Sequence, residues 1–177
     1  MSLSFVIENI YYLTGSLLFI TSFWQLLLAQ KAHKTLCTRQ TSQLIKEFND
    51  TISIIGNSFL EKIIKENLED SSVEFNEHTE LSDEVMNNYL IFIEKHSTEL
   101  YTLLNFLEIY STQINKKIVD IKTSFECNSL TFCEYVRCLS VPIYILRQKS
   151  NGFAYKNIVE LYYNWKNKLE KNNELIK

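Results

Sequence analysis

The chain has 177 residues, enough for one domain plus a membrane anchor, and 46% of them are hydrophobic, which suffices for a packed core. It contains one proline and three glycines, and because turns between strands draw on these residues, their scarcity favours long helices. The formal net charge of −3 excludes a polybasic nucleic-acid binder, so we expect no direct binding to DNA.

Charge is spread unevenly along the chain. Residues 31–65 carry six Lys or Arg and three acids, and residues 66–84 carry eight acids with no Lys or Arg. Residues 128–177 carry eight Lys or Arg and four acids. The four cysteines form no C-x-x-C pair and the last three have no histidine nearby, so we predict no metal site and no cofactor.

The first long apolar stretch runs from Asn9 to Gln30, which is 22 residues without a charge. A helix of that length spans roughly 33 Å, close to the thickness of a bilayer's hydrocarbon core. The alternatives are a core helix of a soluble protein, which normally keeps a polar face, and a cleaved signal peptide, which has a basic start and an A-x-A-like site. The stretch has neither set of features, so we predict a transmembrane helix over residues 9–30.

The charges at the two ends of this stretch predict its orientation. Lys31, Lys34 and Arg39 follow it, whereas Glu8 is the only charged side chain before it. Because cytoplasmic flanks are enriched in Lys and Arg, we expect residues 1–8 outside and the rest of the chain in the cytoplasm. The predicted location is therefore the inner (cytoplasmic) membrane, crossed once.

One face of the predicted anchor carries its smallest and most polar groups, which include Gly15, Ser22 and Gln25. Small residues let helices approach in lipid, and Ser or Gln can hydrogen-bond between helices. The pattern is compatible with a homo-oligomer formed through this face, and equally with small residues that have no such role.

We predict an all-α fold in which the anchor helix continues into a cytoplasmic bundle of about four helices. Residues 31–66 form a stalk and the first bundle helix, whose apolar stripe is Leu44, Phe48, Ile52, Ile55, Phe59 and Ile63. Residues 67–83 are acidic and lack periodicity, which predicts a solvated linker or a flexible loop. His78 in this linker is more simply explained as solvated than as a metal ligand.

Residues 84–177 supply the remaining bundle helices. The second helical region begins near Ser82 and extends to about residue 118, with Ser97 and Thr98 either capping a new helix or lying within a long one. Residues 119–128 are expected to be a connection. A third helix is predicted over Ser129–Gln148, kinked at Pro142, and a last helix follows the turn at residues 150–152.

No motif for phosphate, dinucleotide, zinc or nucleophile chemistry is present, so we predict no catalytic residues and a protein that is not an enzyme. One surface does invite a ligand: Arg137, Ser140, Tyr144 and Arg147 follow at spacings of three and four, and Lys149 comes next. Arg pairs with phosphate and Tyr stacks on bases, so an anionic ligand such as a nucleotide could bind there. The simpler alternative is an ordinary solvated helix face.

Two motifs at the ends of the chain resemble a family. The first is a YYxxG anchor with a Q-x-x-x-A and basic stalk, here Tyr11, Tyr12, Gly15, Gln25, Ala29 and Lys31. The second is a Cys helix with an LR pair and a Y…L…W-K segment, here Cys133, Leu146, Arg147, Tyr155, Leu161, Trp165 and Lys166. They resemble short bacterial membrane proteins of unknown function, some of them associated with phage defence. The resemblance implies an anchored helical protein and defines no active site.

We therefore expect a non-enzymatic, membrane-anchored sensor or effector, and the resemblance implies a role in antiviral defence. Its helical domain would bind a protein partner or an anionic ligand, and its anchor would contact membrane lipid and form a homo-oligomer. The alternatives are a structural subunit of a larger membrane complex and, less favoured, a tethered hydrolytic enzyme.

Overall fold

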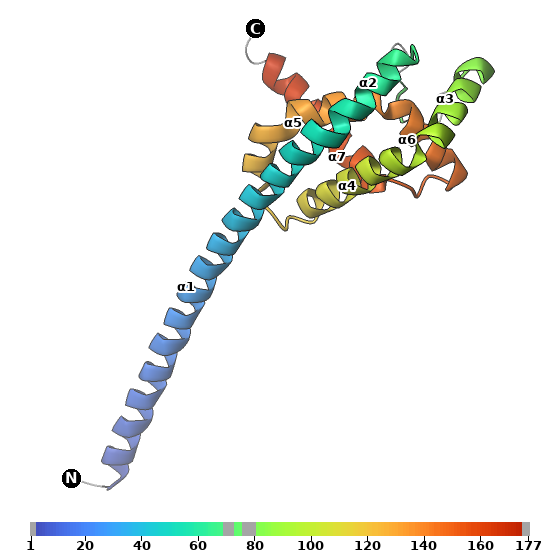
Figure 1. Cartoon of the computed structure of the whole chain (residues 1–177). Coiled ribbons are helices and arrows are strands. Elements are labelled where there is room, and N and C mark those ends of the chain that lie inside the picture. The colour runs from blue at the N-terminus through green and yellow to red at the C-terminus, as the bar shows by residue number, and fades with distance from the viewer. Residues whose placement is uncertain (1–2, 69–72, 76–80, 175–177) are drawn as a thin grey trace. The chain divides into compact units, whose positions relative to one another are not determined.

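The computed structural model describes the backbone of residues 3–68, 73–75 and 81–174, with side chains described from residue 14 to residue 172 within those ranges. Every regular element in these ranges is helical, which confirms the predicted all-α class (Figure 1). The elements are α1 (Leu3–Thr51), the π-helical turn η1 (Ile52–Gly56), α2 (Asn57–Lys65), α3 (Asp83–Lys95), α4 (Ser97–Asn115), α5 (Ile121–Cys138), α6 (Ser140–Lys149) and α7 (Lys156–Glu174). The chain divides into two compact units, Met1–Arg39 and Gln40–Lys177.

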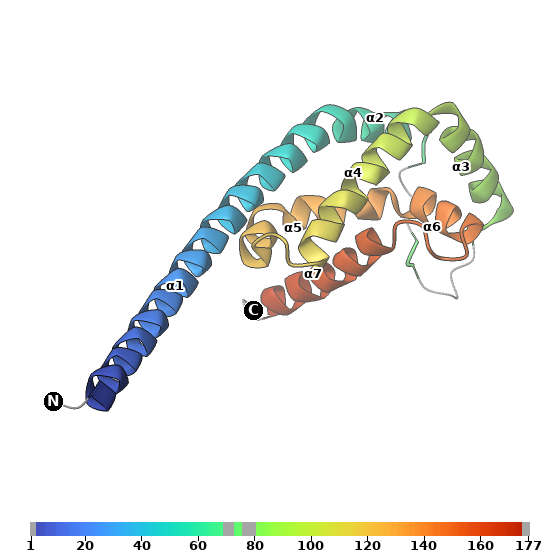
Figure 2. The same ribbon diagram turned by 90° about the horizontal axis from the view of Figure 1, so that it is seen from below.

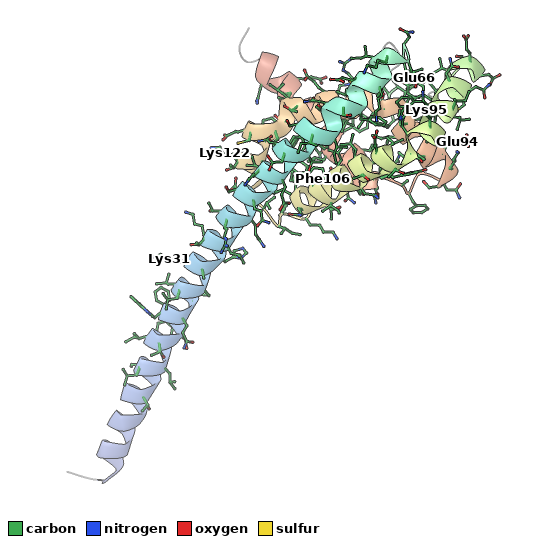
Figure 3. All side chains as sticks on the ribbon, in the orientation of Figure 1. Lys31, Glu66, Glu94, Lys95, Phe106 and Lys122 are labelled. Atoms are coloured by element: carbon green, nitrogen blue, oxygen red, sulfur yellow. The ribbon has the colours of Figure 1, made fainter. Side chains whose placement is uncertain are left out.

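The first unit is the N-terminal part of α1, an unbroken α-helix across the predicted anchor and stalk. From residue 17 to residue 28 its large apolar side chains are all between 43% and 73% exposed: Leu17, Leu18, Phe19, Ile20, Phe23, Trp24, Leu26, Leu27 and Leu28. The side chains of Tyr11 and Tyr12 lie outside the described residues. Lys31, which ends the uncharged stretch, is exposed (Figure 3).

By length and composition, none of the described helices qualifies alone as a membrane span. Helices α5 and α6 pass such a test only as a pair, bent by 63° at the break between them. Both contribute buried side chains to the second unit's core, among them Phe132 and Val136 on α5 and Ile143 on α6.

The core of the second unit is an aromatic cluster where the end of α1 meets α4, α5 and α7. Phe48 lies with its ring centre 4.5 Å from that of Tyr110, and Phe132 lies 5.2 Å from Trp165 in an edge-on arrangement. These four rings are at most 2% exposed. Figure 2 shows α4 alongside α7, the helices that carry Tyr110 and Trp165. The predicted stripe of the first bundle helix is buried here except for Ile55, which is partly buried.

The first bundle helix departs from α geometry at η1, next to α5. A Cβ on Gly56 would lie 2.7 Å from Tyr135 Cε1, closer than real Cβ contacts, so only glycine allows this approach. The Tyr135 hydroxyl donates a hydrogen bond to the side-chain oxygen of Asn57. Glycine and the wider turn together let α5 pack directly against the backbone of the first helix.

The second helical region is two helices rather than one, but Ser97 and Thr98 do not cap the second: they lie in the first turn of α4, whose N-cap position is His96 and makes no side-chain cap hydrogen bond. Ser82 caps α3, with its Oγ accepting a hydrogen bond from Val85 N–H (3.4 Å). His96, at φ −115° and ψ 23°, separates α3 from α4.

The prediction of a connection over residues 119–128 is wrong, because α5 begins at Ile121. Asp120 caps this helix: its Oδ1 accepts a hydrogen bond from Thr123 N–H (2.6 Å). Helices α3 and α5 both begin just after a residue whose side-chain oxygen accepts a hydrogen bond from a backbone N–H of the first turn. The cap at Asp120 marks a helix start ahead of the predicted one at Ser129.

The prediction of one kinked helix over Ser129–Gln148 is also wrong. Helix α5 ends at Cys138 and α6 begins at Ser140. Within a continuous helix the ring of Pro142 would collide with the carbonyl of Cys138, four residues earlier. The break at Leu139 instead places Pro142 in the first turn of α6, where its missing N–H costs nothing.

Candidate functional site

The break at Leu139 divides the predicted ligand surface between two helices. Arg137 is exposed in the last turn of α5, whereas Tyr144 and Arg147 are half-buried on α6 and Lys149 is exposed at its end. Their regular spacing in the sequence would place them on one helix face only if they belonged to a single helix. They do not form one continuous stripe, although all four belong to the basic C-terminal half of the chain.

Arg147 is engaged in holding the turn between α6 and α7. Its Nη1 donates to the carbonyl oxygen of Ala154 (2.8 Å), and its own carbonyl accepts from Gly152 N–H (2.8 Å) and Ser150 Oγ (3.1 Å). Gly152 has φ 82°, a backbone conformation that residues other than glycine rarely adopt. The guanidinium of Arg147 therefore has a structural partner, and the cations left for a ligand are Arg137 and Lys149.

Sequence reasoning missed a second feature of this region: residues 73–75 of the acidic segment lie against α6 and α7. Val73 N–H donates to Ser140 Oγ and Phe75 N–H donates to the Tyr163 hydroxyl, both at 3.0 Å. Ser140 is only 1% exposed. We call these residues, Val73 to Phe75, the docked tripeptide.

The side chains of the docked tripeptide also contact α7. The ring of Phe75 meets Tyr162 and Tyr163 edge-on at 5.8 and 6.3 Å, and Glu74 Oε1 lies 3.7 Å from Lys166 Nζ. The described residues of the segment 67–83 are therefore not all solvated. The sequence signal that could have predicted this contact is the pair of apolar residues, Val73 and Phe75, on either side of Glu74. Residues 69–72 and 76–80, His78 among them, lie outside the described residues.

Cys133 and Tyr162 have perturbed acidities beside Lys166. Burial raises the pKa of the Cys133 thiol to about 12, an effect that Lys166 partly opposes and Glu134 adds to. Burial likewise raises the pKa of Tyr162. A thiol with this pKa stays protonated at neutral pH, so it is a poor nucleophile and a poor metal ligand.

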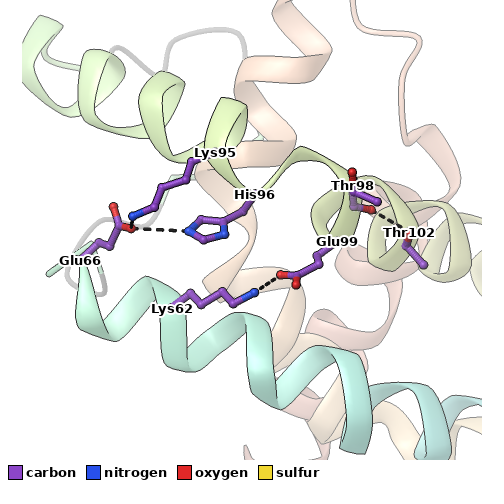
Figure 4. Close-up of polar contacts among 7 residues, drawn as sticks. All are labelled: Lys62, Glu66, Lys95, His96, Thr98, Glu99 and Thr102. Carbon is purple, nitrogen blue, oxygen red and sulfur yellow. Dashed lines mark hydrogen bonds and ion pairs between the residues drawn. The ribbon is translucent and has the colours of Figure 1, made fainter.

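A second polar cluster joins the end of α2 to the break between α3 and α4 (Figure 4). Lys62 pairs with Glu99, Lys95 Nζ lies 2.5 Å from Glu66 Oε1, and His96 Nε2 lies 3.5 Å from the same oxygen. Lys95 is the main cause of a lowered pKa at Glu66, which burial opposes and His96 supports.

His96 and Glu99 are three positions apart in the sequence, but each faces a different partner: Glu99 pairs with Lys62 on α2, and His96 lies beside Glu66 just after it. The arrangement fastens three helix ends to one another. Among the described residues, no group of three or more His, Cys, Asp or Glu could hold a metal ion.

A family model described as a domain of unknown function (DUF4760) matches residues 14–165 of the chain. The chain belongs to the DUF4760 family. The DUF4760 match begins at Thr14, just before the exposed apolar side chains of α1, and ends at Trp165 in the core, so it covers parts of both compact units. This match agrees with the resemblance in one respect: both point to a family of unknown function. No curated protein and no solved structure is significantly similar to the chain.

Proposed function

We propose that this DUF4760 protein is a membrane-anchored binding module that acts without catalysis. In this proposal residues 9–30 cross the inner membrane once, with the N-terminus outside. The helical domain then binds an anionic ligand or a protein partner on the cytoplasmic side, as a sensor or effector. A role in antiviral defence follows from the sequence resemblance alone.

The exposed apolar side chains of α1 are the observation that carries the anchor. Nine large apolar residues from Leu17 to Leu28 surround the helix and are 43–73% exposed. Completing the burial of each is worth roughly 1 kcal/mol, so together they favour a lipid environment by on the order of 10 kcal/mol. Lys31, Lys34 and Arg39 follow this segment and support the orientation.

The small face of the anchor is compatible with oligomerisation. A Cβ on Gly15 would meet no atom within 4 Å, and Ser22 and Gln25 are exposed on the same helix. Another helix could approach closely at Gly15 and form hydrogen bonds with Ser22 and Gln25.

Exposed basic side chains of α5, α6 and α7 are the proposed ligand contacts. Arg137 is exposed in the last turn of α5, Lys149 is exposed at the end of α6, and Lys166 on α7 is 37% exposed. The ion pair between Glu74 and Lys166 supports an anionic ligand, because a carboxylate of the chain already pairs with one of these cations.

Membrane fractionation of the full chain tests the anchor. We expect it to remain in the pellet after washing with alkaline carbonate and to require detergent for release. A variant with Leu18→Lys and Ile20→Lys should be released, because charge at the centre of a span costs several kcal/mol. The matched control, Ile109→Lys and Ile91→Lys, changes two similarly exposed residues of the second unit and should stay in the pellet. Purification of the full chain as a stable monomer without detergent would refute the anchor.

A further inference from the structure

The turn between α6 and α7 presents an unusually exposed aromatic ring. Phe153 is 81% exposed, more than any other large apolar side chain in the described part of the chain. The second unit buries its other phenylalanines at least partly, within or against its core. A ring so exposed to water contributes little to folding, and it is accessible to a surface outside the domain.

The backbone around Phe153 is held by a network of hydrogen bonds. Gly152 N–H donates to the carbonyl of Arg147 (2.8 Å), Phe153 N–H to that of Ser150 (3.2 Å), and Ala154 N–H to Ser150 Oγ (2.9 Å). The guanidinium of Arg147 closes the turn on the carbonyl of Ala154. Because this conformation is fixed in advance, binding through Phe153 loses little entropy.

The charges around the ring are positive. Lys149 and Lys156, both exposed, flank Phe153 in the sequence, and residues 135–159 contain no Asp or Glu. In the described part of the chain, Glu108 on α4 is an acid that reaches this region, where it accepts hydrogen bonds from Asn157 and Ile158 at the start of α7. Its charge is thereby engaged with the helix terminus. The turn therefore presents two exposed lysines on either side of one apolar ring.

We infer that this turn is a contact site for an anionic lipid bilayer, in which Phe153 enters the interfacial layer and Lys149 and Lys156 lie among the phosphate headgroups. Aromatic rings favour that layer, and each lysine near it gains from the negative surface potential. The inference rests on the proposed anchor, which would keep the domain close to the membrane and so make a weak contact effective. A protein pocket would also accept Phe153, but long flexible lysines suit a fluid surface better than a fixed one.

The test uses the full chain in nanodiscs of phosphatidylcholine alone or mixed with phosphatidylglycerol. A Phe153→Trp variant, compared with the same chain without that change, reports the environment of the introduced indole through its fluorescence. In the mixed nanodiscs we expect its emission to shift to the blue and to be quenched by shallow spin-labelled lipid. Lys149→Gln with Lys156→Gln should reduce that quenching several-fold, and phosphatidylcholine alone should give little.

An Ile109→Trp variant is the matched control, since Ile109 is exposed on α4 without flanking lysines. Its indole should stay accessible to water-borne acrylamide in both lipids. Equal responses of the two indoles, or no response at Phe153→Trp in chains that have entered nanodiscs, would overturn the lipid contact while leaving the anchor intact. Failure of the chain to enter nanodiscs would overturn the anchor and, with it, the contact.

Discussion

Glu108 is the residue on which the junction of α4 and α7 most depends. One carboxylate oxygen accepts hydrogen bonds from Asn157 N–H (3.1 Å) and from its side-chain Nδ2 (2.7 Å), and the other accepts from Ile158 N–H (3.0 Å). Asn115 completes the junction by donating to the Asn157 carbonyl (3.1 Å). We predict that Glu108→Ala destabilises the domain more than any substitution of an exposed acid.

The magnitude follows from the groups left without partners. A hydrogen bond to a charged group contributes about 1.5–3 kcal/mol, and a charge at a helix N-terminus adds about 0.3–1 kcal/mol. Glu108 is half-buried, so water will replace part of what is lost. We therefore expect Glu108→Ala to lower the free energy of unfolding by about 2–3 kcal/mol. Glu108→Gln keeps one acceptor but turns an amide toward Ile158 N–H, and should lose about half as much.

Urea unfolding of the full chain in detergent micelles measures this loss through the fluorescence of Trp165, which is buried in the core. Trp24 is replaced by Phe in every variant to remove its signal. With a urea dependence of about 1–3 kcal/mol per molar, the midpoint should fall by roughly 1 M for Glu108→Ala. Glu126→Gln is the matched control, since its pair with Lys122 is exposed and contributes little. If the two variants have the same midpoint, the carboxylate does not hold α7 and the reasoning is refuted.

Three further predictions concern other parts of the domain. Gly56→Ala should lower the free energy of unfolding by about 1–3 kcal/mol in the same urea assay, although alanine has a higher helix propensity than glycine. Adding Tyr135→Leu to this variant should relieve the loss, and an unchanged midpoint for Gly56→Ala would contradict the close approach. Phe75→Ala should speed amide hydrogen exchange at residues 73–75 and leave α4 protected; equal rates in both proteins would show that the ring does not hold the docked tripeptide. Burial raises the pKa of the Cys133 thiol to about 12, so as pH rises the unfolded chain loses this proton before the folded chain does. The free energy of unfolding should therefore fall from about pH 8 upward. Cys133→Ala should make that fall less steep, and an unaltered slope would show that this thiol is not its cause.

The helix content of the domain could be predicted from periodicity, but its divisions could not. The stripe from Leu44 to Ile63 is buried nearly throughout, because burial of one helix face is what periodicity encodes. The apolar period also continues across Leu139, where the chain turns by 63°. A bent helix pair can bury the same stripe as a straight helix, so only the clash at Pro142 distinguished the two.

The candidate site was less predictable than the fold. Arg147 was predicted to bind a ligand, whereas in the structure its guanidinium donates to the carbonyl of Ala154, in the turn that its own side chain closes. The docked tripeptide was not predicted, because the many acids of residues 67–83 indicated a solvated segment in spite of the two apolar residues Val73 and Phe75. Contacts between residues 67 or more positions apart, such as Val73 with Ser140, leave no trace in local spacing.

The π-helical turn at Ile52–Gly56 changes how this helix should respond to insertions and deletions. Leu44 and Ile63 lie 19 positions apart on the buried face, whereas five ordinary turns take about 18 residues, and the wide turn holds the additional one. Removing one residue from a regular helix rotates everything beyond it by about 100° and exposes its core face. Here a one-residue deletion within the wide turn restores α geometry and keeps the two ends in phase, so this position should accept a length change that other positions in the same helix would not.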